Sequence, residues 1–144
     1  MKFSIATALT VLAGVASARI DYFTVPSTIK PGDKFEVTLE GHNYIQSMYE
    51  IAAAFGITGS VYSQYSDSLQ IYLDSVYLGP EKSNTVHNYK FPVTLPESVQ
   101  KGDYTFGVGL FELVGALNSP SAGFMHANIT VGDETSSELV EGGF

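Results

Sequence analysis

The sequence predicts an all-β fold, an immunoglobulin-like two-sheet sandwich of about seven strands without disulfides. Turn residues recur at intervals of roughly ten to fifteen positions between short apolar runs, a spacing typical of such sandwiches. Several of the runs alternate between apolar and polar residues, as strands with one buried face do. The chain contains no cysteine, so side-chain packing alone must hold the two sheets together.

Three runs show the alternation most clearly. In KFEVTLE, residues 34–40, apolar side chains occupy every second position and so share one face. Runs that begin at Tyr104 and at Phe124 follow the same pattern. The remaining predicted strands are residues 20–25, 49–55, 70–78 and 88–95. The second and third of these four also fit the helical period, so a helix is the alternative for both.

Two residues place particular strands within the sandwich. Pro92 lies inside its run, and because proline has no N–H to donate, this strand should lie at a sheet edge or carry a bulge. Tyr104 follows the segment KGD and enters a late strand, which resembles the tyrosine corner of immunoglobulin-like sandwiches. We therefore interpret Tyr104 as a structural residue.

Residues 1–18 have the features of a secretory signal peptide. Lys2 precedes an apolar run, and the segment ends in small residues. Cleavage is predicted between Ala18 and Arg19, and the apolar run is too short to hold the chain in a membrane. We therefore expect a secreted protein without a membrane anchor.

The predicted mature chain divides into a β-sandwich domain, residues 19–132, and an acidic flexible tail, residues 133–144. Loss of the leader removes Lys2, and six basic residues then stand against fifteen acidic ones. The basic residues are scattered singly, whereas binding to a phosphate backbone needs them clustered. Nucleic acid is therefore not expected as a partner.

None of the common catalytic motifs is present. The sequence lacks G-x-S-x-G, H-E-x-x-H, a P-loop and a dinucleotide fingerprint, and the absence of cysteine excludes thiol catalysis. His42, His87 and His126 are the candidates for a metal site, but the strand pattern gives them no shared face. We expect no enzymatic activity, no catalytic residues, no metal site and no cofactor.

Weaker signals leave carbohydrate chemistry open. Asp67, Asp74 and Glu81 lie near one another in the sequence, and a glycosidase needs two carboxylates beside its sugar. Aromatic platforms for sugar rings could come from Tyr62, Tyr65, Tyr72 and Tyr77. An extracellular wall-associated or carbohydrate-binding module is the alternative function, and an enzyme with clustered carboxylates is a third.

Asn128-Ile129-Thr130 is an N-glycosylation sequon. Strand alternation independently places Asn128 and Thr130 outward and Ile129 inward. We therefore predict a glycan on Asn128 in a host that glycosylates its secreted proteins.

Several stretches together resemble a known family. The most specific is YLGPEKSN, residues 77–84, with its flanks. The others are VPSTIKPG (25–32), NYIQS (43–47), AFG (54–56), KGDYTF (101–106) and ITVGDETSS (129–137). On these motifs the chain is identified as a member of the necrosis-inducing secreted protein family, small cysteine-free effectors of filamentous fungi. The final segment, ELVEGGF, has no clear match in that family.

The resemblance implies a fungal effector that suppresses pattern-triggered immunity in plants and induces cell death in some of them. The implied partners are a plant receptor-like co-receptor kinase and a receptor-like cytoplasmic kinase. A cytoplasmic target requires translocation into the host plant cell, which a cysteine-free fold tolerates because it has no disulfide to lose. The resemblance attaches no catalytic residue to the family and links activity to the C-terminal part, from about residue 115 onward.

The YLGPEKSN segment reads as a turn that presents polar side chains. Gly79-Pro80 cannot continue a central strand, so the chain must turn there. We expect that packing does not dictate the next four side chains and that their replacement by Gly and Ser leaves the fold intact. They form the candidate interface with a partner: Glu81, Lys82, Ser83 and Asn84.

Overall fold

The computed structural model describes residues 16–62 and 67–144, which form nine strands and one short 3-10 helix. The strands are β1 (Ser17–Pro26), β2 (Thr28–Ile29), β3 (Lys34–Tyr44), β4 (Met48–Gly59), β5 (Ile71–Tyr77), β6 (Tyr89–Thr94), β7 (Gly102–Val114), β8 (Ser119–Val131) and β9 (Leu139–Gly143), with the helix η1 (Ser60–Tyr62) after β4. All seven predicted runs are strands, including the two with a helical alternative. Most of the predicted leader, residues 1–15, and Tyr65 lie outside the described residues.

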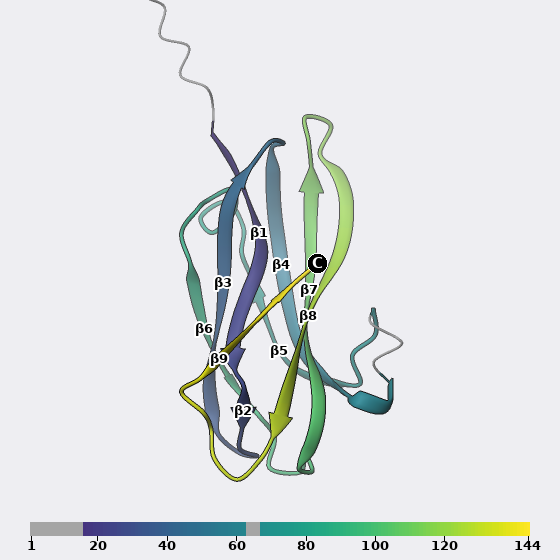
Figure 1. Cartoon of the computed structure of the whole chain (residues 1–144). Coiled ribbons are helices and arrows are strands. Elements are labelled where there is room, and N and C mark those ends of the chain that lie inside the picture. Colours follow the sequence, from purple (N-terminus) through teal and green to yellow (C-terminus); the bar gives the residue numbers. More distant parts are fainter. Residues whose placement is uncertain (1–15, 63–66) are drawn as a thin grey trace, which may run out of the picture.

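The strands form two layers around one core (Figure 1). The order β5-β4-β7-β8 makes one layer, which we call the β7 sheet, and β9-β1-β3-β6 makes the other, which we call the β3 sheet. Hydrogen bonding continues from one to the other, because β8 pairs with β9 at His126 and Gly143. After β1 the chain changes layers, and β2 pairs in parallel with β8. The predicted sandwich is confirmed, with nine strands rather than seven.

Phenylalanine rings fill the centre of the sandwich. The Phe106 ring on β7 lies 5.6 Å from that of Phe23, 6.0 Å from that of Phe35 and 6.5 Å from that of Phe55. Burial of such a side chain contributes about 1.5–3 kcal/mol to stability. None of the tyrosines in the described residues is fully buried, because a phenol hydroxyl needs a polar partner. The core therefore depends on phenylalanine and aliphatic residues.

Both strand placements made from single residues agree with the structure. Pro92 lies on β6, which ends the order of the described strands with β3 as its neighbour, so β6 is an edge strand as predicted. Tyr104 on β7 is half-buried and packs against the core, which supports its interpretation as structural.

The C-terminal segment differs from the expectation of a flexible tail over residues 133–144. Strand β9 pairs with β1 along five residues, and Figure 1 shows it crossing the sandwich beside β1. A Cβ atom on Gly142 would meet Phe23 Cε1 at 2.4 Å, so the glycine lets the backbone lie against this ring. Before β9, the Thr135 hydroxyl donates a hydrogen bond to Asp33 Oδ2 at 2.7 Å. The acidic tail is ordered because its strand β9 pairs with the edge of β1 that faces away from β3.

Candidate functional site

The candidate interface, residues 81–84, lies between β5 and β6 and is divided by burial. Glu81 is exposed and Lys82 is half-buried, so both side chains remain available to a partner. Ser83 is buried, and Asn84 adopts a φ of 49°, in the left-handed region that non-glycine residues seldom occupy. The expectation that packing dictates none of these four residues is therefore wrong for Ser83 and Asn84.

Both residues are bound to Glu50, a buried carboxylate on β4. Glu50 Oε2 accepts hydrogen bonds from Ser83 Oγ at 2.5 Å and from the Asn84 N–H at 2.9 Å. Ser83 Oγ accepts one from the Glu50 N–H at 2.7 Å. On the β1 side, the Ile20 N–H donates to Glu50 Oε1 at 2.9 Å, and the Ala18 N–H donates to Asn84 Oδ1 at 2.8 Å. The network ties the turn to β1 and β4.

A second buried carboxylate, Glu112 on β7, is the register partner of Glu50. Glu112 Oε1 accepts a hydrogen bond from Arg19 Nη2 at 2.7 Å, whereas Oε2 is buried and has no partner in residues 16–62 and 67–144. The Arg19 guanidinium carbon also lies 4.3 Å from the centre of the Phe144 ring and 5.4 Å from that of Tyr44, within the range of cation–π contacts. Burial raises the pKa of Glu112, the Arg19 guanidinium opposes this rise, and the Glu50 carboxylate adds to it.

The carboxylate pair is closed to solvent. Glu50 is 0% and Glu112 is 1% exposed. A glycosidase must bring both of its carboxylates to a sugar, and these two do not reach the surface where a sugar would bind. Their hydrogen bonds instead join β1, β4, β7 and the turn at one end of the sandwich.

Sequence reasoning missed this pair, although one signal was available. The alternation that places Phe106, Val108 and Leu110 inward continues to Glu112, which therefore occupies an inward position of the same strand. A charged residue at such a position is rarely buried unless it is paired, so a partner was to be expected. Glu50 is harder to find, because the register between β4 and β7 shifts between Glu50 and Ala52.

The structure does not bring the three predicted carboxylates into one site. Asp67 precedes β5, Asp74 lies within it and Glu81 follows it. Asp74 Oδ1 accepts a hydrogen bond from the backbone N–H of Ser75 at 2.8 Å.

The three histidines lie on separate elements. His42 lies on β3, and its Nδ1 is 2.6 Å from Asp21 Oδ1. His126 lies on β8, and His87 lies in the loop before β6. Over residues 16–62 and 67–144, no three His, Cys, Asp or Glu side chains are placed to hold a metal ion.

Across the same ranges, no helix has both the length and the apolar character to cross a membrane.

An open apolar groove of about 470 Å³ lies on the outer face of the β7 sheet. Its floor is made of small residues because the alternation along β4, β7 and β8 turns the larger side chains into the core. Ala54 on β4 is the register partner of Gly109 on β7, and Ala122 on β8 is that of Phe111. The side chains of Leu69 and Phe124 lie against Gly56 and Gly109 of this floor, and the groove beside them is open.

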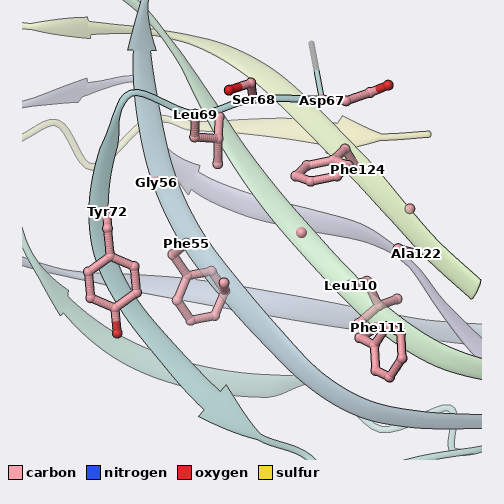
Figure 2. A pocket seen from close by; sticks show the side chains of 13 residues that line it. Phe55, Gly56, Asp67, Ser68, Leu69, Tyr72, Leu110, Phe111, Ala122 and Phe124 are labelled. Atoms are coloured by element: carbon pink, nitrogen blue, oxygen red, sulfur yellow. The ribbon is translucent and has the colours of Figure 1, made fainter.

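Aromatic rings surround this floor. Figure 2 shows the rings of Tyr72, Phe111 and Phe124 around the groove, with Asp67 and Ser68 near Leu69 at one end. Tyr72 is 65% and Phe111 is 46% exposed, although both are large and mainly apolar. Of the three described tyrosines proposed as sugar platforms, Tyr62, Tyr72 and Tyr77, Tyr72 alone lines the groove.

The two outer faces of the sandwich differ in charge. Strands β4, β5, β7 and β8 contain no lysine or arginine. The outer face of the β3 sheet instead carries opposite charges in contact, such as Lys90 and Glu36 at 2.9 Å. The apolar groove and the absence of cations make the outer face of the β7 sheet the better candidate for a binding surface.

The predicted glycosylation site is accessible. Asn128 and Thr130 on β8 are exposed and Ile129 is buried, as the alternation predicted. Thr105 Oγ1 on the neighbouring strand lies 3.5 Å from Asn128 Oδ1. Occupancy of Asn128 by a glycan stays a prediction, as does cleavage between Ala18 and Arg19.

These features define a class of protein, a cysteine-free two-sheet β-sandwich with an open apolar surface on one outer face. The chain belongs to the Nis1 family, whose model matches residues 16–130. Necrosis-inducing secreted protein 1 of Colletotrichum orbiculare is 41% identical over 133 residues, which cover 92% of this chain and 82% of the relative. The protein of the same name from Colletotrichum higginsianum is 42% identical over 139 residues, which cover 96% and 95%.

The family match confirms the resemblance found in the sequence, and both relatives are named as secreted proteins, which supports secretion of this chain. Among solved structures, a cellulose-active polysaccharide monooxygenase from M. thermophila aligns with a TM-score of 0.46 and 17% identity. The alignment covers 78% of this chain and 56% of that chain. A likeness of this size supports no inference about activity.

Proposed function

We propose that this protein is a secreted fungal effector that suppresses pattern-triggered immunity by binding plant immune receptor-like kinases, and that it induces cell death in some plants. The observation that carries the proposal is membership of the Nis1 family, together with two relatives that are named necrosis-inducing secreted proteins. The proposed partners are a receptor-like co-receptor kinase and a receptor-like cytoplasmic kinase. Binding alone is the mechanism, without a chemical step.

The outer face of the β7 sheet is the surface that we propose for kinase binding. Interfaces gain most of their affinity from a few large, mainly aromatic side chains near the centre, and Tyr72 and Phe111 stand at the rim of an open groove. The exposed Glu81 and the half-buried Lys82 lie beyond the end of β5, the edge strand of the same sheet. These two residues form a second, smaller contact in this proposal.

The absence of cysteine supports a function on both sides of the plant membrane. A sandwich held by phenylalanine packing and by the Glu50 network loses no covalent link in a reducing cytosol. A contact with a receptor-like cytoplasmic kinase therefore needs no change in the fold.

A pull-down of purified kinase domains by the mature chain tests the proposal. The expected result is recovery of both kinases by the unmodified chain and weaker recovery by a Phe111→Ser variant. Leu117→Ser is the matched control, because Leu117 is equally apolar and 90% exposed but lies in the β7–β8 turn, away from the groove. Failure of the unmodified chain to bind either kinase contradicts the proposal.

A carbohydrate-binding module of the plant wall remains the second candidate function. The rings of Tyr72 and Phe111 beside the groove favour it, because sugar rings stack on exposed aromatic faces. Co-sedimentation with glucan or chitin tests this candidate. Recovery with a polysaccharide, combined with no recovery of kinases, would replace the first proposal by the second.

A further inference from the structure

When both carboxyl groups are ionised, the charges at this end of the sandwich are not balanced. Two carboxylates, Glu50 and Glu112, stand against one guanidinium, that of Arg19. Glu112 Oε2 and Arg19 Nε are both buried, and neither has a hydrogen-bond partner among the residues that the structure describes. Buried charge of one sign is costly unless a partner of the other sign accompanies it. The site therefore fits one more cation, and the free acceptor oxygen calls for an N–H donor.

The backbone nitrogen of Arg19 lies between two nitrogens of β1 that contact this site. The nitrogen of the next residue, Ile20, lies 2.9 Å from Glu50 Oε1, and that of the preceding residue, Ala18, lies 2.8 Å from Asn84 Oδ1. Successive residues of a strand advance by only about 3.3 Å. The Arg19 nitrogen lies between these two along β1. In the uncut chain it is a neutral amide whose N–H points to the opposite side, toward β3, where Arg19 is the register partner of His42.

We propose that Glu50, Glu112 and Asn84 form a binding site for the α-ammonium group of Arg19, which exists only after the chain is cut between Ala18 and Arg19. Hydrolysis of this peptide bond transfers the hydroxyl of water to the Ala18 carbonyl carbon, which departs with the leader as a carboxylate. The released amine takes up a proton and becomes the ammonium. The proposal rests on the predicted cleavage position and is independent of kinase binding.

The chemistry of the site suits this ligand. A primary ammonium has three N–H donors and one positive charge. Cleavage also removes the Ala18 N–H, so Asn84 Oδ1 loses its donor and becomes free to accept from the ammonium. With the ammonium bound, two cations face two carboxylates. Processing then completes the packing of the N-terminal strand, and a residual leader or an added tag leaves the charges unbalanced.

Two further charged groups lie near Arg19, one on β3 and one on β1 itself. On β3 its register partner is His42, which is 2.6 Å from Asp21 of β1. Both side chains are partly exposed and Asp21 is already paired with His42, so Asp21 competes only weakly for the ammonium. The carboxylates on β4 and β7 are the buried acceptors.

An NMR titration of the α-amino group tests the site. In the chain that begins at Arg19, the pKa of this group should exceed the ordinary range for α-amino groups, about 7.7–8.0, by at least about one unit, which is a tenfold change in proton affinity. In a chain that begins at Ser17, the group lies two residues away and should titrate in the ordinary range. An ordinary pKa for the Arg19 amine would overturn the proposal, as would a secreted protein whose first residue is not Arg19.

Two substitutions distinguish the effect of the buried site on the pKa of the Arg19 amine from the effect of the overall negative charge of the protein. Glu112→Gln keeps an oxygen for Arg19 Nη2 and removes one buried charge, so the pKa of the Arg19 amine should fall toward the ordinary range. Glu134→Gln removes one exposed charge from the segment before β9 and should leave this pKa unchanged. Equal shifts in the two variants would assign the effect to the overall charge and overturn the proposal.

Unfolding at different pH values gives a second readout that does not depend on a substitution. A raised amine pKa in the folded state contributes stability that is complete below the unfolded value, near 8, and is lost as the pH rises through the folded value. The chain that begins at Arg19 should show this loss above about pH 8. The same chain with an acetylated N-terminus should not show it, and equal pH profiles for the two forms would contradict the proposal.

Discussion

The two sides of the β7 sheet each depart from the usual distribution of residues, in opposite ways. On the inner side, at one end, Glu50 and Glu112 are fully buried. On the outer side, Tyr72 and Phe111 are exposed around an apolar groove. Charged residues normally lie outside and large apolar ones inside. Glu50 and Oε1 of Glu112 are bound by donors of the chain itself, whereas the exposed rings border open space. The first feature therefore maintains the fold, and the second is available to a partner.

Removal of the Glu50 carboxylate should have the largest effect on stability. Glu50→Ala leaves the Ile20 and Asn84 N–H groups and the Ser83 hydroxyl without their acceptor. We expect a loss of about 3–5 kcal/mol in the free energy of unfolding, measured with urea. Glu36→Ala is the matched control, since Glu36 is an exposed carboxylate paired with Lys90, and should cost about 0–1 kcal/mol. Similar losses in both variants would remove the distinction between the two kinds of carboxylate.

Within the turn, Ser83 and Glu81 should behave differently. Ser83→Ala removes a buried hydroxyl that both donates to and accepts from Glu50, and should cost about 1–3 kcal/mol in unfolding free energy. Glu81→Ala should change stability by less than about 0.5 kcal/mol, because the side chain is exposed. The Tyr89 hydroxyl donates to the backbone oxygen of Glu81 at 3.0 Å, a contact that alanine keeps. Thermal unfolding of the two variants checks the difference, and equal stabilities would restore the view that the whole turn is free of packing.

Glu112 should make stability depend on pH in the weakly acidic range. Its pKa is raised in the folded state, so the folded chain retains a proton that the unfolded chain has lost, and stability falls as the pH rises above the ordinary glutamate value of about 4.3. Glu112→Gln has no proton to lose there and should show a shallower fall, by up to about 1.4 kcal/mol per pH unit. Urea unfolding between about pH 4 and pH 7 measures both slopes, in a chain that begins at Ser17 and so keeps the uncut site. Parallel slopes would mean that Glu112 does not titrate differently on folding.

On the outer face, substitution should affect binding rather than stability. Phe111→Ser should change the free energy of unfolding by no more than about 1 kcal/mol, because its ring is already half in solvent. Affinity for the kinase should fall about tenfold or more, which corresponds to about 1.4 kcal/mol. Titration calorimetry against the kinase domain, with Leu117→Ser as the control, measures this. A variant that binds as tightly as the parent would move the interface away from the groove.

Much of the fold was predictable because alternation along a strand is a local property. The alternation shows which side chains enter the core in residues 34–40 and in the runs from Tyr104 and Phe124. In the structure these side chains lie in the core or pack against it. Pro92 indicated an edge strand because its missing N–H excludes a neighbour on one side. The candidate site was predicted less well, since Glu50 and Glu112 were missed and their hydrogen bonds to Ser83 and Asn84 could not be foreseen.

Local sequence thus determined the strand segments, their inward faces and the all-β class, because these follow from the spacing of residues within a few positions of one another. The tertiary structure decided the contacts between distant positions. Ser83 and Asn84 are buried or constrained because Glu50, 33 and 34 positions earlier, needs their donors. The acidic tail forms β9 because the edge of β1, at the other end of the chain, offers it hydrogen bonds. The groove exists because small residues from three strands meet on one face, which depends on register between strands and not on the pattern within any one of them.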